Sequence, residues 1–171
     1  MKAHHRRPPA LVSVIDASDP DFESVGACIN ARSTKEWNVE RIARASHRSI
    51  ALTGTYRSPT AAALFSDYAH GLDQPAIERL RIGLMEEDGS RFSASLADLS
   101  GGEPFAMLEY IESFERGRGL ARAIIEAIGA HRDLIASPID RSVLPFYEAL
   151  GFFALEVYDS TFDRPLMRRP A

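Results

Sequence analysis

A short string rich in glycine and arginine, Arg116-Gly117-Arg118-Gly119-Leu120-Ala121, is the clearest chemical signal in the sequence. The residues from its end onward are apolar at helical spacing, at Leu120, Ala123, Ile124, Ala127 and Ile128. A helix that begins directly after glycines points its unpaired backbone N–H groups and the positive end of its dipole at one spot. This arrangement suits a phosphate or pyrophosphate, because the glycines keep side chains out of the approach.

The string does not match the common nucleotide-binding loops. It lacks the lysine and hydroxyl of a nucleoside-triphosphate loop, and its spacing is not Gly-x-Gly-x-x-Gly followed by an acidic residue about 20 positions on. We therefore expect another phosphate-bearing cofactor. A nucleic-acid-binding tract is an alternative, but such tracts are long, disordered and repeated, whereas Arg-Gly-Arg-Gly lies between a predicted strand and a predicted helix.

Two motifs in this half of the chain resemble those of one enzyme family. Arg116-x-x-Gly119-x-Ala121 matches the Arg/Gln-x-x-Gly-x-Gly/Ala signature with which GCN5-related N-acetyltransferases hold the pyrophosphate of coenzyme A. A predicted strand at 134–137 follows, and then Phe146-Tyr147-Glu148-Ala149-Leu150-Gly151-Phe152, which is similar to the family's Phe-Tyr-x-x-x-Gly-Phe segment. The resemblance covers roughly residues 79–171. The chain departs from it at Asp140, where many members carry asparagine, and at Val143, where alanine is usual.

The resemblance implies a three-layer αβα sandwich around a mixed, mainly antiparallel sheet. Two strands of that sheet are expected to splay apart and admit the pantetheine arm of acetyl-coenzyme A between Ile111 and Ile135. The implied cofactor-binding residues are Ile111, Arg116, Gly117, Arg118, Gly119, Leu120, Ala121, Asp140, Phe146 and Tyr147. The implied reaction is direct attack by an amine on the acetyl group. The residues agree with the absence of a covalent intermediate, because no serine, cysteine or histidine stands in a nucleophile constellation.

Three residues are candidates for proton transfer. In the family a tyrosine at the position of Tyr147 commonly protonates the departing coenzyme A thiolate; the alternative is a packed core aromatic. An attacking amine must lose a proton, and Glu109 and Glu112 are the candidate bases, with ordered water as the alternative. Because strand side chains alternate, these two glutamates are expected on opposite faces, so that at most one faces the acetyl group.

The predicted elements place these residues in one domain, 1–171. Its parts are a flexible tail at 1–9, a helical region at 35–78 that shapes the acceptor pocket, and an acetyl-coenzyme A-binding core at 105–152. Early elements are a strand Ala10–Ile15, helices Phe22–Ala31 (capped by Ser18 or Asp19) and Trp37–His47, a strand-like stretch Ser49–Tyr56, and a helix that starts at Ser58-Pro59 and ends near His70-Gly71.

The later elements begin with a three-stranded meander. It comprises Arg79–Glu87, a turn at Asp88-Gly89, Arg91–Leu99 and Phe105–Ser113. Beyond the strand at 134–137, a helix capped by Asp140 or Ser142 is expected to accept Pro145 in its first turn and to end at Gly151, with Phe152 folding back on Phe146 or Tyr147. A final hairpin joins 152–158 to 166–169.

Composition limits the function classes. The chain has 171 residues, 45% of them hydrophobic, a net charge of -4 and one cysteine, Cys28. We therefore expect one domain, no nucleic-acid or membrane partner, no disulfide, no metal site and a cytoplasmic location. His4 and His5 are interpreted as part of a frayed terminus, and His47 and His131 as surface residues. For the aromatics Trp37, Tyr56, Phe65 and Tyr68, core packing is the expectation weighed against a place in the acceptor pocket.

Several alternatives stay open at this point. The acceptor is an amine of a small molecule or of a protein, and the acyl group is acetyl or longer. A non-catalytic acyl-coenzyme A-binding regulatory or interaction module is the alternative function, and an interaction module without cofactor is a third. The oligomeric state is open, with a homodimer as the commonest assembly.

Overall fold

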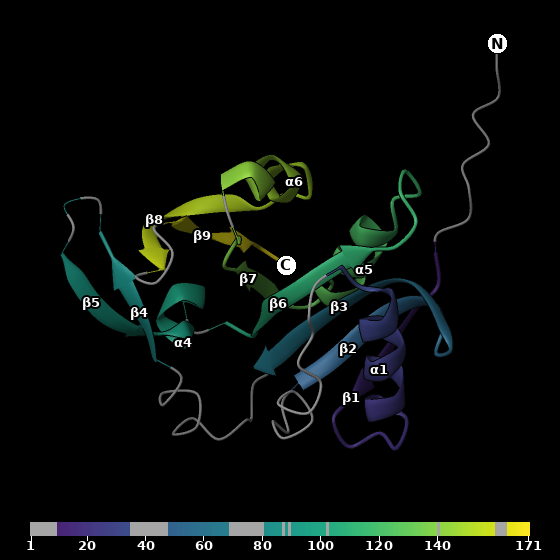
Figure 1. Ribbon diagram of the computed structural model, residues 1–171. Helices are drawn as coiled ribbons and strands as arrows, with labels where there is room; N and C mark the ends of the chain where they lie inside the picture. Colours follow the sequence, from purple (N-terminus) through teal and green to yellow (C-terminus); the bar gives the residue numbers. More distant parts are fainter. Residues whose placement is uncertain are drawn as a thin grey trace, which may run out of the picture.

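The computed structural model describes residues 10–34, 48–68, 81–86, 88, 90–101, 103–139, 141–159 and 164–171. The predicted helix Trp37–His47 and the candidate residue Asp140 lie outside them. The strands of this part of the chain are β1 Val12–Asp16, β2 Arg48–Thr55, β3 Ser58–Tyr68, β4 Arg81–Met85, β5 Arg91–Ser95, β6 Phe105–Ser113, β7 Asp133–Ala136, β8 Phe153–Asp159 and β9 Arg164–Arg169. They form one sheet in the order β1-β2-β3-β6-β7-β9-β8-β4-β5, visible in Figure 1.

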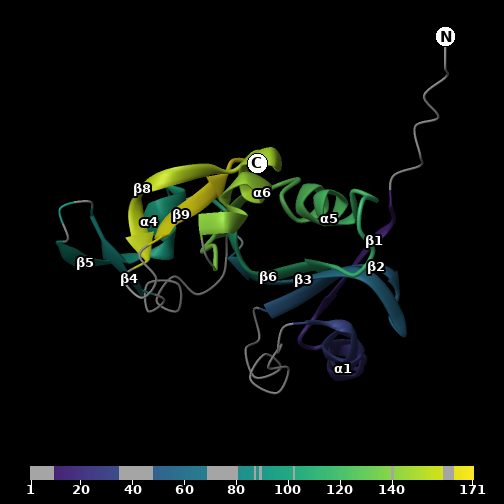
Figure 2. The same ribbon diagram turned by 45° about the horizontal axis from the view of Figure 1, so that its top comes forward.

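Helices cover both faces of this sheet. They are α1 Phe22–Arg32, α4 Leu96–Ser100, α5 Leu120–Ile128 and α6 Leu144–Ala149, the last preceded by a 3-10 turn, η1, at Arg141–Val143. Figure 2 shows α1 on one side of β2, β3 and β6, and α5 on the other side. Two of the buried apolar clusters lie on opposite faces, one beneath α5 and the other beneath α1. The predicted three-layer arrangement around a mixed sheet is confirmed.

Strand β3 corrects the largest error of the sequence interpretation. A helix was expected from Ser58, but residues 58–68 form a strand between β2 and β6. Ala61 and Ala63 belong to the cluster under α5, and Ala62 and Leu64 belong to the cluster under α1. A strand buried on both faces has no polar–apolar alternation, and its alanines favour a helix when read by propensity alone. The described part of the predicted helical region 35–78 is thus β2 and β3.

The expected meander is also wrong in its pairing. Strand β6 has the predicted bounds, Phe105–Ser113, but its neighbours are β3 and β7. Strand β5 ends at Ser95, and the residues expected to extend it to Leu99 form α4. The hairpin of β4 and β5 itself is confirmed, and it joins the sheet at the far end, through β8.

Helix α5 is amphipathic as predicted, but its buried face differs in part, because Ile125 is buried and Ala127, predicted on that face, is exposed. Its buried side chains are Leu120, Ile124, Ile125 and Ile128. Each such side chain contributes about 1.5–3 kcal/mol by leaving water. The helix packs over β3, where the small alanine side chains allow a close approach. This packing fixes the position of the loop that precedes α5.

The remaining helix ends differ from prediction in their caps. Helix α1 begins at Phe22 as expected, but its N-cap is Asp21, without a side-chain hydrogen bond. The N-cap of α6 is Val143 rather than Ser142, while a proline occupies the first turn as predicted. Gly151 after α6 has a φ of 88°, and the antiparallel hairpin of β8 and β9 follows.

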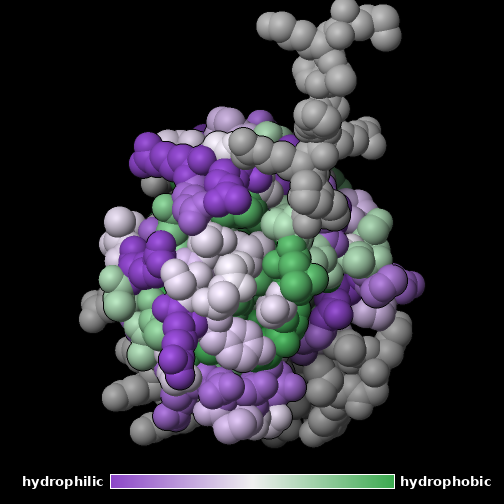
Figure 3. All heavy atoms as spheres, turned by 90° about the vertical axis from the view of Figure 1, so that its right-hand side faces the viewer, coloured by the Kyte–Doolittle hydropathy of each residue, from purple (hydrophilic) through white to green (hydrophobic). Residues whose placement is uncertain are grey.

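Strand β1 is one outer edge of the sheet, because it pairs only with β2 among the described strands. Ile15 is buried in the cluster under α1, whereas Leu11 and Val14 are exposed. Figure 3, which views the molecule from the right-hand side of Figure 1, shows a face on which hydrophobic and hydrophilic side chains are mixed. The edge strand therefore contributes to both clusters, through Ile15 on the side of α1 and through the partly buried Val12 on the side of α5.

Candidate active site

A cavity of about 510 Å³ opens where strands β6 and β7 stop pairing. The two strands run parallel and pair from Phe105 with Asp133 to Leu108 with Ala136. Beyond that point β6 continues for five residues without a partner in β7. The cavity is lined by Glu109, Tyr110, Ile111, Glu112, Ser113, Ala121, Ser137, Pro138, Ile139, Val143, Phe146 and Tyr147. The predicted separation of two strands is therefore present, with Ile111 in the gap. Ile135, predicted on the other side of the gap, instead pairs with Met107 before the strands separate and does not line the cavity.

The glycine-containing loop and the first turn of α5 lie at one side of this cavity. Gly119 is the N-cap of α5, and Ala121 in the first turn lines the cavity. Gly117 and Gly119 have φ values of 71° and 69°, which residues other than glycine rarely adopt. Apart from the adjacent residues, no heavy atom of the described part of the chain lies within 4 Å of the position that a Cβ would take at either glycine. The loop therefore presents bare backbone to open space.

The backbone N–H groups of this first turn are available to a ligand. The first hydrogen bond within the helix runs from the Ala123 N–H to the Gly119 carbonyl, 3.0 Å. The N–H groups before it have no partner inside the helix, which is the property that binds anions at helix N-termini. Arg116 and Arg118 are exposed beside them, and Arg118 pairs with Glu115. Leu120 has a buried side chain, so that only its backbone can reach a cofactor.

Tyr147 contributes a partly buried phenol to the cavity wall. Its ring meets the rings of Phe146 and Phe152 edge-on, each at 5.3 Å between centroids. The predicted fold-back of Phe152 is thus confirmed. Burial raises the pKa of Tyr147 to about 12, because an ionised phenolate would be poorly solvated there. Within the described part of the chain its hydroxyl has no hydrogen-bond partner, and it stays protonated at neutral pH.

Glu109 is held by side chains from two neighbouring strands. Its Oε1 atom accepts hydrogen bonds from Arg48 Nε at 3.0 Å and from Ser66 Oγ at 2.5 Å. Arg48 lies on β2 and Ser66 on β3, directly opposite each other in the register. The carboxylate is consequently fixed at the cavity edge.

Glu112 is held by the segment that follows α1. Its Oε2 atom accepts a hydrogen bond from the Ser33 hydroxyl. Its Oε1 atom accepts bonds from the Thr34 backbone N–H at 3.2 Å and from the Thr34 hydroxyl at 2.9 Å. Both oxygens of this carboxylate therefore accept hydrogen bonds from the end of α1.

The two glutamates lie on the same face of the sheet, which contradicts the expectation from strand alternation. The register of β6 with β3 shifts, since Leu64 pairs with Tyr110 but the next residue, Phe65, pairs with Leu108. Glu109 is thus an extra residue, a β-bulge, and a bulge reverses the alternation of the residues beyond it. Both carboxylates consequently point to the side of the sheet covered by α1.

The fold that positions this cavity occurs in solved acetyltransferase structures. One is a GNAT-family acetyltransferase from Desulfovibrio desulfuricans, with a TM-score of 0.57, 14% identity and coverage of 94% of this chain and 99% of that one. Another is the ribosomal-protein-S18-alanine N-acetyltransferase from Escherichia coli, with a TM-score of 0.53, 13% identity and 94% coverage of both chains. The chain has the fold of the GCN5-related N-acetyltransferases.

The same GCN5-related fold is found in an acyl-CoA N-acyltransferase from Pseudomonas aeruginosa, with a TM-score of 0.52, 11% identity and coverage of 93% of this chain and 98% of that one. No family model and no curated protein matches the sequence. The likeness at this level of identity concerns the architecture, and the roles of individual residues have to be argued from their geometry.

Within this acetyltransferase fold, the structure brings together Glu109, Ile111, Glu112, Ala121, Phe146 and Tyr147 of the predicted site. Arg116, Gly117, Arg118 and Gly119 lie in the loop outside the cavity wall. Sequence reasoning missed the partners of the glutamates, Arg48, Ser66, Ser33 and Thr34. No motif marks them, because each is a common residue type that acquires its role only through strand register or the end of a helix.

Other candidate residues lie away from the cavity. Phe65 and Tyr68 are buried, and Tyr68 stacks on Phe105 at 4.8 Å, so that both are core aromatics as expected. Tyr56 is 37% exposed, and His131 is exposed. The described residues contain no cluster of three or more metal-ligating side chains. None of the helices in the described ranges is long and apolar enough to cross a membrane.

Proposed function

We propose that this protein transfers an acetyl group from acetyl-coenzyme A to an amine. The observation that carries the proposal is the cavity itself, which runs from the first turn of α5 at Ala121, along the unpaired edge of β6, to Tyr147. The N-terminus of α5, the edge of β6 and the phenol of Tyr147 thus follow one another along the cavity. The pyrophosphate, the pantetheine arm and the thioester follow one another in the same order in acetyl-coenzyme A.

The residues present fit coenzyme A on three counts. Its pyrophosphate suits the free N–H groups before Ala123 and the side-chain-free space at Gly117 and Gly119, with the cations of Arg116 and Arg118 nearby. Its pantetheine amides suit the edge of β6 beyond Leu108, because a strand edge offers alternating donors and acceptors. The apolar parts of the arm suit the side chains of Ile111 and Phe146.

The chemistry is direct acyl transfer. The amine nitrogen attacks the thioester carbonyl carbon, the new C–N bond forms, and the C–S bond breaks to release the thiolate. The nitrogen loses its proton to a base, for which Glu109 is the candidate, since Arg48 and Ser66 hold its carboxylate at the cavity edge. Approach of both reactants within one cavity supplies the orientation that accelerates the step.

Tyr147 is placed to assist departure of the sulfur. With a pKa raised to about 12, its hydroxyl is a neutral donor throughout the neutral range. A thiolate whose conjugate acid has a pKa of about 8.5 is a weaker base than this phenolate, so the hydroxyl donates a hydrogen bond to the developing charge and solvent completes protonation. This is stabilisation of charge that exists only as the thioester breaks.

The test is a screen for thiol release from acetyl-coenzyme A with amines of four classes: spermidine, kanamycin, lysine and a tetrapeptide with a free N-terminal alanine. We expect at least one class to release thiol above the rate of hydrolysis. A rise in melting temperature with acetyl-coenzyme A should accompany it, because a ligand that binds only the folded state stabilises that state. Binding without release would favour the non-catalytic module, and no binding at millimolar cofactor would overturn the proposal.

A further inference from the structure

The end of α1 is fastened to the cavity strand through a single carboxylate. Glu112 of β6 accepts three hydrogen bonds, from the Ser33 hydroxyl, the Thr34 N–H and the Thr34 hydroxyl. The donors are consecutive residues that immediately follow α1, which ends at Arg32. Glu112 also lines the cavity. One residue therefore belongs both to the cavity wall and to the contact that holds the end of a helix.

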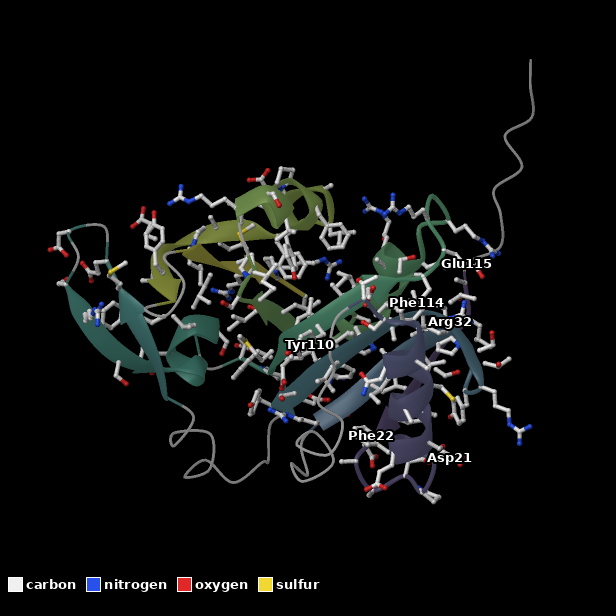
Figure 4. All side chains as sticks on the ribbon, viewed as in Figure 1. Asp21, Phe22, Arg32, Tyr110, Phe114 and Glu115 are labelled. Atoms are coloured by element: carbon white, nitrogen blue, oxygen red, sulfur yellow. The ribbon has the colours of Figure 1, made fainter. Side chains whose placement is uncertain are left out.

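A second contact joins the same two elements. The guanidinium of Arg32 lies over the ring of Phe114 at 5.6 Å from its centroid, and Figure 4 shows the two side chains beside each other. Arg32 also donates a hydrogen bond to Ser58 Oγ at 3.0 Å, at the start of β3. The end of α1 is thus docked on the end of β6 by two adjacent interactions, a carboxylate cluster and a cation–π contact.

The geometry of Glu112 suits an anchor better than a base. Hydrogen bonds to a charged carboxylate are stronger than neutral ones, and both of its oxygens accept them. A base has to aim a lone pair at the ammonium proton of the acceptor, and capturing that proton would weaken all three bonds that hold Ser33 and Thr34. Glu112 is therefore positioned to keep its charge and its partners.

The position of this anchor identifies what it controls. The helix N-terminus that suits the donor belongs to α5, on the opposite face of the sheet from α1. Direct attack requires the amine to approach from the other side. We infer that Glu112 is a positioning residue that fixes Ser33 and Thr34 against the end of β6, beside the cavity, and thereby sets the affinity for the amine acceptor. This inference rests on the proposed function.

The test compares the kinetics of Glu112→Gln, Ser33→Ala and Thr34→Val with the amine of the screen that releases most thiol. We expect the KM for the amine to rise about 10-fold in Glu112→Gln and about 3-fold or more in each partner variant, since charged hydrogen bonds are lost. The kcat, its pH profile and the KM for acetyl-coenzyme A should stay within about 2-fold of wild type. In the double variant Glu112→Gln with Ser33→Ala, the KM for the amine should rise little beyond that of Glu112→Gln alone, because both substitutions disrupt the same hydrogen-bonded cluster. Glu126→Gln, an exposed carboxylate on α5, is the matched control.

Two results would overturn the inference. In one, kcat of Glu112→Gln falls about 100-fold and the decline of kcat at low pH disappears, while Ser33→Ala and Thr34→Val behave as wild type. That result would make Glu112 the base. Unchanged kinetics in all three variants would leave the cluster without a role. If Glu112→Gln fails to fold, the partner variants decide alone.

Hydrogen exchange at the Thr34 amide separates failure of this inference from failure of the proposed function. Faster exchange in Glu112→Gln is expected whether or not the enzyme turns over, because the amide loses its acceptor. If no amine gives thiol release in the wild type, the proposed function fails and the positioning role fails with it. If thiol is released but neither Thr34 exchange nor the amine KM changes, only the role of Glu112 fails.

Discussion

The two faces of β6 are built by different means. On the side of α5, apolar packing under the helix holds a turn whose contribution to the site is backbone: bare glycines and unpaired N–H groups. On the side of α1, polar side chains hold the site: Glu109 with Arg48 and Ser66, and Glu112 with the end of α1. The donor side should therefore be intolerant of any added side chain, whereas the acceptor side should be adjustable by single substitutions.

The strongest way to break this comparison is Gly119→Asp. The substitution puts a side chain and a negative charge into open space where the donor phosphate is expected, at a φ of 69°. We expect loss of measurable acetyl-coenzyme A binding by calorimetry in a folded protein. Gly101→Asp is the matched control, because Gly101 has a φ of 68° and equally open surroundings but lies after α4. It shares the backbone strain and should bind normally; equal affinity in both variants would place the donor elsewhere.

A contrast in stability sharpens the comparison. Ile124→Ala empties a fully buried site beneath α5 and should lower the free energy of unfolding by about 2–5 kcal/mol. Ser66→Ala removes one hydrogen bond on the α1 side and should cost only about 1 kcal/mol. Denaturant titration measures both. A cost for Ser66→Ala as large as that for Ile124→Ala would mean that polar contacts, and not packing, dominate the sheet's stability.

Tyr147→Phe tests whether the Tyr147 hydroxyl takes part in turnover. The variant keeps the ring packing with Phe146 and Phe152 and removes only the hydroxyl. We expect kcat to fall by roughly 10²-fold while the affinity for acetyl-coenzyme A is unchanged, because the hydroxyl acts only as the thiolate leaves. Tyr56→Phe, in the turn between β2 and β3, is the control. Full activity of Tyr147→Phe would leave the tyrosine with packing alone.

The smallest expected effect is a pH dependence of stability due to the same phenol. The pKa of Tyr147 in the folded protein is raised to about 12 by burial, above its ordinary value of 10.0. Its contribution is present below pH 10 and is lost as pH rises toward 12, since the unfolded chain ionises first. At pH 11 the wild type should lose about 1 kcal/mol relative to Tyr147→Phe. If the free energies of unfolding of the wild type and of Tyr147→Phe change in parallel from pH 9 to 11, the hydroxyl is solvated and its pKa is not raised.

Sequence alone predicted the elements on the α5 side of the sheet well because their signals are local. The bounds of β6, the amphipathic face of α5 and the fold-back of Phe152 on Tyr147 each follow from periodicity or from a glycine that ends a helix. That the glycine loop binds phosphate stays a prediction, which rests on the general ability of helix N-termini to bind anions. Here neighbouring residues carry the information.

The acceptor side could not be predicted because its determinants are not local. The alanines of β3 favour a helix by propensity, and only burial on both faces makes them a strand. The bulge at Glu109 has no sequence mark, so alternation assigned Glu109 and Glu112 to opposite faces. Their partners come from α1, β2 and β3, far along the chain.

The parallel pairing of β6 with β7 also bears on how the protein folds. Four residues of each strand form this seam, Phe105–Leu108 and Asp133–Ala136, and the chain between them must first cross the sheet through α5. The hairpins β2–β3 and β8–β9 close much shorter loops, which form faster than long ones. The two parts of the sheet should therefore assemble separately and join late in the folding reaction. Since the donor cavity lies directly beyond the seam, competence to bind the donor should arise in that last kinetic phase.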